Sequence, residues 1–87
     1  MQKYLIHRTV GQLTDGEIEA SGSRSVDVLA GMSGIRWIRS YYSAEEGKIY
    51  CEYEALNLEL LLEHARRADL PFDGASLVRE LDPTMFR

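Results

Sequence analysis

The feature that most constrains the fold of this chain is a pair of alternating segments near the middle of its sequence. Residues 35–43 and residues 48–55 both alternate between two sets of side chains, as expected of strands with two different faces. The residues between them read Ala-Glu-Glu-Gly, and a short connection that ends in glycine is typical of a hairpin turn. The sequence therefore predicts a central antiparallel hairpin, around which the other segments must pack.

One register of this hairpin pairs opposite charges. Placing Arg39 opposite Glu52 stabilises the hairpin by roughly a few tenths of a kcal/mol. The same register sets two further pairs opposite each other, Tyr42 with Ile49 and Ser40 with Cys51. One face of the hairpin then carries three aromatic residues beside charged ones: Trp37, Tyr41 and Tyr50 with Arg39, Glu52 and Glu54.

The segment before the hairpin predicts one strand and one helix. Residues 3–10 alternate as a strand. Thr14 and Glu17 have the S/T-x-x-E spacing of a capping box, so we expect a helix to begin at Asp15. We expect Gly31 to end this helix with a left-handed cap.

The segment after the hairpin predicts a second helix and a last strand. Asn57 caps a helix over residues 58–68, and Pro71 prevents its continuation. Five apolar residues at helical spacing form the expected core stripe of this helix: Leu58, Leu61, Leu62, Ala65 and Ala68. A final strand over residues 76–81 ends at Asp82.

The order strand, helix, hairpin, helix, strand indicates the fold class. It is that of the ferredoxin-like β-α-β-β-α-β sandwich, an α+β fold with a four-stranded antiparallel sheet and both helices on one face. A chain of 87 residues suits a single domain over residues 1–87. The uncovered face would expose its three aromatic residues to water, so we expect two copies to form a homodimer through their sheets.

Composition excludes several kinds of partner. A net charge of −4 argues against nucleic acid, whose phosphates require a concentrated basic surface. No apolar run approaches the roughly 20 residues that span a bilayer, and no signal-peptide pattern opens the chain. We therefore expect no membrane partner and a cytoplasmic protein. The single cysteine, Cys51, excludes an intrachain disulfide and a thiolate-rich zinc site.

The residues best suited to bind a metal ion are two histidines. His7 stands in the first strand and His64 in the second helix, and neither has another imidazole or thiol within four residues. A metal site would therefore be assembled across strands or across a dimer, with carboxylates completing it. Imidazole, carboxylate and water suit nickel or zinc by ligand type. No catalytic motif occurs in the chain, so we assign no catalytic residue.

The first helix leaves room for a different kind of site. Its expected inward stripe contains Gly22 and Ser25, which put almost no side-chain volume into the core. Either large aromatic side chains fill that space or a small-molecule pocket forms there. The candidate lining residues of such a pocket are Trp37, Ser40, Tyr41, Tyr50, Cys51 and His64.

Several segments of the chain occur in the order and spacing of a known family: residues 4–8, 34–41, 48–55, 63–67 and 82–84. In these segments the chain resembles small bacterial nickel-binding, nickel-responsive proteins with a dimeric ferredoxin-like fold. The pairing of Y-C-x-Y with E-H-A is the most specific part of the likeness. The resemblance implies a homodimer that binds nickel at the dimer surface and has no known catalytic activity. Two positions depart from the family pattern, because His7 replaces an acidic residue and Asp69 replaces a glycine.

Three functions follow as alternatives. The first is a small dimeric protein that binds nickel or another divalent metal ion through His7 and His64, with a role in metal response. The second is an enzyme or small-molecule carrier that uses a pocket between the sheet and the first helix. The third is a structural or partner-binding dimer with no small ligand.

Overall fold

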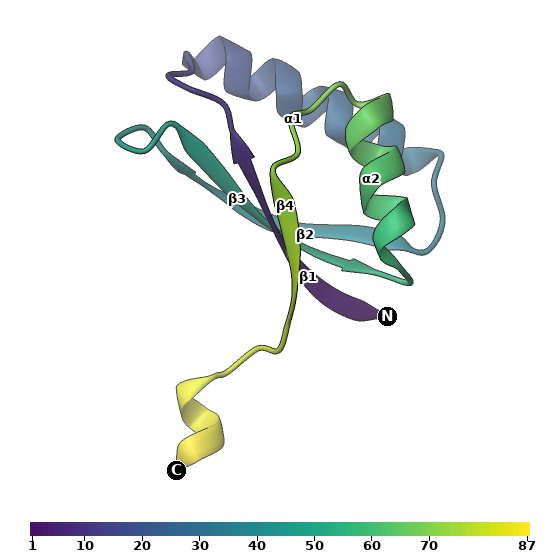
Figure 1. Ribbon diagram of the computed structural model, residues 1–87, viewed down its shortest axis with the longest axis vertical. Helices are drawn as coiled ribbons and strands as arrows, with labels where there is room; N and C mark the ends of the chain where they lie inside the picture. Colours follow the sequence, from purple (N-terminus) through teal and green to yellow (C-terminus); the bar gives the residue numbers. More distant parts are fainter.

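The structure, a computed structural model that describes residues 1–87, contains four strands and two long helices in the predicted order (Figure 1). The elements are β1 (Gln2–Thr9), α1 (Asp15–Ala30), β2 (Ile35–Ser43), β3 (Lys48–Ala55), α2 (Leu58–Arg67), β4 (Gly74–Val78) and the short 3₁₀ helix η1 (Pro83–Phe86). The strands form one antiparallel sheet in the order β2-β3-β1-β4, and both long helices lie against one of its faces. The predicted ferredoxin-like α+β fold is confirmed. Neither α1 nor α2 has the length and apolar composition needed to cross a membrane.

The register predicted for the β2-β3 hairpin is confirmed. Arg39 lies opposite Glu52, and its Nε is 3.6 Å from the Glu52 Oε1 atom. The other two predicted pairs are also present, Ser40 with Cys51 and Tyr42 with Ile49. Because the Arg39 side chain is largely exposed, this ion pair contributes at most about 1 kcal/mol. Its main effect is to favour one register over the others.

A β-bulge in β2 moves Trp37 to the face that the helices cover. Trp37 pairs with Tyr53, and the register shifts before the next pair, so that Ile38 is an extra residue of β2. One extra residue reverses the alternation of everything before it in the strand. The prediction that Trp37 lies on the uncovered face is therefore wrong. Its indole Nε1 instead donates a hydrogen bond of 2.8 Å to Ser40 Oγ on the covered face.

The hydrophobic core lies where β1 and β3 meet α2. Its fully buried large side chains are Ile6, Tyr53, Leu61 and His64. The apolar stripe predicted for α2 is partly wrong, because Leu58 and Leu62 are 41% and 45% exposed. Small side chains at Ala65 and Ala68 let α2 approach the sheet closely, and Leu58 and Leu62, which share one side of the helix, lie outside that contact.

Both predicted helix starts are present. The Thr14 backbone N–H donates to Glu17 Oε1 at 2.9 Å, and the Glu17 N–H donates to Thr14 Oγ1 at 3.1 Å, which completes the capping box of α1. Asn57 accepts a hydrogen bond of 3.1 Å from the Leu60 N–H at the start of α2. The left-handed cap predicted at Gly31 is wrong, since its φ is −101°. Gly34 takes the left-handed conformation instead, with φ +77°.

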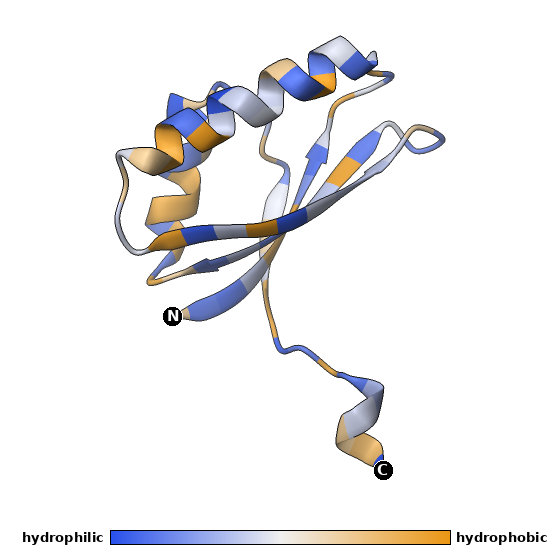
Figure 2. Cartoon of the chain, turned by 180° about the vertical axis from the view of Figure 1, so that it is seen from behind, coloured by the Kyte–Doolittle hydropathy of each residue, from blue (hydrophilic) through white to orange (hydrophobic).

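The last strand is shorter and begins earlier than predicted. β4 ends at Val78, opposite Lys3, because β1 offers almost no backbone beyond that point for pairing. Residues 79–87, here called the C-terminal arm, leave the sheet and carry η1 well away from it (Figure 1). The arm exposes three large apolar side chains: Leu81, Met85 and Phe86. In Figure 2, parts of the arm are accordingly orange, the colour of hydrophobic residues.

The two neighbouring leucines of α2 provide a matched test of this core. Leu61 is fully buried, so Leu61→Ala should lower the free energy of unfolding by about 2–5 kcal/mol through the cavity that it creates. Leu62→Ala makes the same chemical change on the same helix at a half-exposed position, and it should cost less than about 1 kcal/mol. Urea denaturation of both variants measures the difference. Equal losses would contradict this orientation of α2.

Candidate functional site

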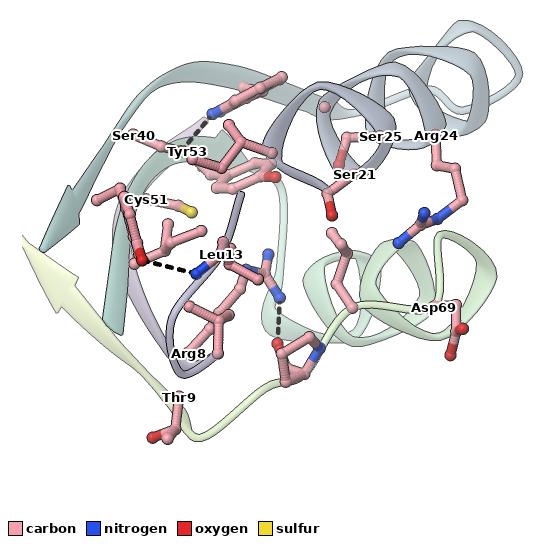
Figure 3. A pocket seen from close by; sticks show the side chains of 18 residues that line it. Arg8, Thr9, Leu13, Ser21, Arg24, Ser25, Ser40, Cys51, Tyr53 and Asp69 are labelled. Atoms are coloured by element: carbon pink, nitrogen blue, oxygen red, sulfur yellow. Dashed lines mark hydrogen bonds between the residues drawn. The ribbon is translucent and has the colours of Figure 1, made fainter. Parts of the chain in front are cut away.

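A cavity of about 480 Å³ lies between α1 and the covered face of the sheet (Figure 3). Its apolar wall comes from several elements and the loops beside them: Val10, Leu13, Ile18, Trp37, Ile49 and Leu70. This volume is typical of a pocket that binds a small molecule. We call this space the α1 cavity.

Small residues on α1 keep the cavity open. Gly22 and Ser25 both line it, as the sequence predicted for the inward side of this helix. A Cβ atom added at Gly22 would have no neighbour within 4 Å, so the space beside this residue is open. Trp37 lines the cavity but does not fill it. This part of the core therefore contains a cavity that large aromatic side chains do not fill.

The structure brings together half of the residues predicted to line a pocket. Trp37, Ser40 and Cys51 line the α1 cavity. Tyr41 and Tyr50 do not, because they pair with each other on the opposite face of the sheet, and His64 is buried outside the cavity wall. Neighbouring residues of a strand point to opposite faces, so Tyr41 could not share a face with Ser40, nor Tyr50 with Cys51.

The hydroxyl groups of Tyr41 and Tyr50 bond to acidic side chains on the uncovered face. Tyr41 donates to Glu52 Oε1 at 3.1 Å, and Tyr50 donates to Glu46 Oε1 at 2.6 Å. This hydrogen bond to a carboxylate raises the pKa of Tyr50. Both hydroxyl groups therefore form hydrogen bonds on the side of the sheet away from the α1 cavity.

Arg8 is a cavity residue that sequence reasoning missed. Its side chain is only 2% exposed, and it lines the α1 cavity (Figure 3). The Nη1 atom donates a hydrogen bond of 2.7 Å to the Pro71 carbonyl, whereas Nη2 is buried with no partner. A signal was present in the sequence, because Arg8 follows the buried Tyr4 and Ile6 at strand spacing and so shares their face.

Tyr53 places a second buried polar group from the sheet in this wall. Burial raises its pKa to about 12, with the nearby Cys51 adding to the rise and the Arg8 guanidinium opposing it. The phenol is therefore protonated throughout the physiological pH range and can donate a hydrogen bond. Together, Arg8 and Tyr53 contribute buried hydrogen-bond donors to the wall of the α1 cavity.

The two candidate metal ligands lie on opposite sides of the sheet. His7 pairs with Tyr50 and points to the uncovered face, since the covered face holds its neighbours Ile6 and Arg8. His64 is fully buried beneath the other face, where its ring centroid lies 5.5 Å from that of Tyr53. The two histidines of one chain therefore cannot bind one metal ion together.

No part of the chain gathers three side chains of His, Cys, Asp or Glu that could hold a metal ion. Near His7, the oxygen donor that the hydrogen bonds identify is Asp73. Its backbone N–H donates to the His7 carbonyl at 3.0 Å, and its carboxylate accepts from Thr9, which shares a face with His7. The residues of a single chain thus do not form a nickel site by themselves.

The chain is similar to known proteins over most of its length. Residues 4–78 match the family described as SCO4226-like nickel responsive proteins. The fold is similar to the crystal structure of SCO4226 from Streptomyces coelicolor A3(2), with a TM-score of 0.80 and 16% sequence identity, covering 92% of this chain and 99% of that one. No curated protein matches the sequence significantly. The family match confirms the resemblance found in the sequence, and the structural likeness shows the fold.

The buried imidazole of His64 should make stability depend on pH. Burial lowers the pKa of His64 below its ordinary value of 6.5, and Arg8 lowers it further. As the pH is lowered below that ordinary value, the unfolded chain binds a proton that the folded chain excludes. The free energy of unfolding therefore decreases as the pH is lowered. His64→Gln should flatten this fall in urea denaturation between about pH 7.5 and 5, because the variant has no proton to bind.

His7→Gln is the matched control for this experiment, because it removes a histidine from the uncovered face instead. The His7→Gln variant should retain the pH dependence of the parent protein, since His64 is still present. If His64→Gln lost stability in acid as steeply as the parent, His64 would not be the group responsible.

Proposed function

The chain belongs to the SCO4226-like family of nickel responsive proteins, and from this premise we propose that it acts as a homodimer in the response to nickel or a similar divalent metal ion. The observation that carries the proposal is the arrangement of apolar surface that one copy leaves without a partner. This surface comprises the uncovered face of the sheet and the C-terminal arm.

The uncovered face is shaped for association with another sheet. It carries Leu5, Tyr41 and Tyr50 in adjacent strands, and no helix lies against it (Figure 1). Tyr41 is 54% exposed in one copy. Ion pairs that link Glu52 to Lys3 and Arg39 spread the charge of this face, so that both signs are available to a second copy. These features favour sheet-to-sheet packing with polar contacts around an aromatic centre.

The C-terminal arm supports the same proposal independently. Its apolar side chains project from a segment that extends away from the rest of the chain, and Leu77 at its base is 63% exposed. An arm of this kind buries its apolar surface when it packs on another protomer, at about 25 cal/mol for each Å² removed from water. If two chains exchanged equivalent arms in a two-fold dimer, the apolar surface of both arms would be buried.

A second copy also supplies what a metal site needs. One chain offers the His7 imidazole and, from a residue whose backbone bonds to that of His7, the Asp73 carboxylate, and two chains offer twice that number of donors. Imidazole and carboxylate with water complete a coordination shell that suits nickel by ligand type. We therefore place the proposed metal site between protomers, with His7 as its nitrogen donor and with His64 outside it.

Nickel should bind saturably, and the bound ion should raise the stability of the protein. At a free nickel concentration about 100 times Kd, one site adds about 2.7 kcal/mol to the free energy of unfolding. His7→Ala should remove this binding in titration calorimetry, because it deletes the nitrogen donor. His64→Gln should retain it. Saturable binding that survives His7→Ala, or no saturable binding in the parent protein, would contradict the proposed site.

The apolar arm should control the oligomeric state. Phe86→Gln removes from each copy the largest exposed apolar side chain of the arm, and it should weaken the dimer roughly tenfold or more in sedimentation equilibrium. Arg87→Gln changes the neighbouring residue without removing apolar surface, so it should leave the dimer intact. A parent protein that sediments as a single chain at micromolar concentration would refute the dimer.

A further inference from the structure

Arg8 places a positive charge in the core without a negative partner. The guanidinium is almost completely buried, and it takes part in none of the ion pairs of the chain. Its Nη2 atom has no hydrogen-bond acceptor. Arginine cannot lose its proton in a protein, so burial cannot neutralise this group as it neutralises a histidine or a carboxyl. A buried ion of this kind is costly unless something of opposite charge approaches it.

The other ionisable groups of the cavity wall do not supply that charge. Tyr53 has a pKa raised to about 12 and is therefore neutral. Asp69 is the carboxylate among the lining residues, but it is exposed and makes no ion pair with Arg8. Arg24 adds a second guanidinium, which donates from Nε to the Ala68 carbonyl at 3.0 Å. The wall thus holds two guanidinium groups and one carboxylate in a chain whose net charge is −4.

Much of the rest of the wall is apolar and aromatic, with a few small hydroxyl side chains. Leu13 and Ile49 line the cavity from one side, and the indole of Trp37 lines it from β2. The Nε1 atom of this indole already donates to Ser40, so the ring presents its apolar surface to the cavity. A ligand that satisfies both parts of the wall needs one anionic group and a hydrophobic body.

We propose that the α1 cavity binds a small organic carboxylate. Its carboxylate accepts hydrogen bonds from Arg8 Nη2 and from the Tyr53 hydroxyl, and its apolar body lies against Trp37. Gly22 and Ser25 provide the space, since larger side chains at these positions of α1 would occupy it.

This site is separate from the proposed metal site. His7 faces away from the helices, whereas Arg8 faces them, so the sheet lies between the two sites. Loss of nickel binding in His7→Ala and loss of carboxylate binding in an Arg8 variant therefore report on different proposals. Either can fail while the other holds.

Trp37 makes the test direct, because it is the single tryptophan of the chain and it lines the cavity. Octanoate, which does not fluoresce, should change the Trp37 emission saturably, and calorimetry should give the same dissociation constant. Octanamide has the same apolar body without the charge, so it should bind at least about tenfold more weakly than octanoate. Inorganic phosphate, an anion without an apolar body, should not saturate the site at concentrations that suffice for octanoate.

Arg8→Met tests the charge while keeping an apolar side chain of similar length. Replacing a buried unpaired charge in this way is often neutral or stabilising, so the variant should fold. It should bind octanoate at least about tenfold more weakly, and it should weaken octanamide binding less, because the amide carries no charge. Equal affinity for octanoate and octanamide in the parent protein, or octanoate binding that Arg8→Met does not weaken, would overturn the proposal.

Gly22→Leu tests the space with Arg8 left in place. The added side chain enters the open region beside Gly22, and leucine is a better helix former than glycine. Octanoate binding should disappear in this variant, while Gly22→Ala, which adds only a Cβ atom, should retain it. Undiminished binding in Gly22→Leu would place the ligand elsewhere and overturn the proposal, whatever the behaviour of Arg8→Met.

Discussion

The pairing of β3 with two neighbours is the constraint on which the rest of this structure depends. β3 hydrogen-bonds to β1 on one side and to β2 on the other, so its register decides which side chains of three strands face the helices. It directs Cys51 and Tyr53 toward α1 and α2, and Tyr50 and Glu52 toward the opposite face. A slip of one residue would exchange the two sets. Both candidate sites, the α1 cavity and the surface around His7, exist on their separate sides because of this one register.

Much of the fold could be predicted because local signals agreed with it. The charge pair in the hairpin predicted the register, and the capping box at Thr14 predicted the start of α1. What the sequence did not show was where the pairing between two strands departs from the regular pattern or stops. The bulge at Ile38 reverses the facing of Trp37 without leaving a glycine or proline to mark it. Likewise, β4 ends at Val78 because β1 offers almost no partner beyond Lys3, and the residues of β4 do not reveal that limit.

The candidate site could be predicted only in part, for related reasons. Gly22 and Ser25 indicated open space beneath α1, since helix interiors seldom leave so little volume on their inward side. Arg8 was missed because a charged residue in an alternating strand is ordinarily taken as exposed. Its burial depends on the loop after α2, where the Pro71 carbonyl accepts one of its hydrogen bonds. That loop lies far from Arg8 in the sequence, so no local pattern could have joined them.

The strongest argument for a ligand in the α1 cavity is where the unfavourable features of this chain are found. A glycine in the middle of a helix costs about 1 kcal/mol relative to alanine, and Gly22 borders the cavity. Arg8, an unpaired buried cation, borders it as well. His64, whose two ring nitrogens are buried without partners, packs against the ring of Tyr53, which also lines the cavity. Each of these costs could be removed by a single apolar substitution, and stability alone would favour all of them. Unfavourable residues gathered around one cavity are typical of functional sites, because a bound ligand there can offset the stability that these residues cost the unliganded protein.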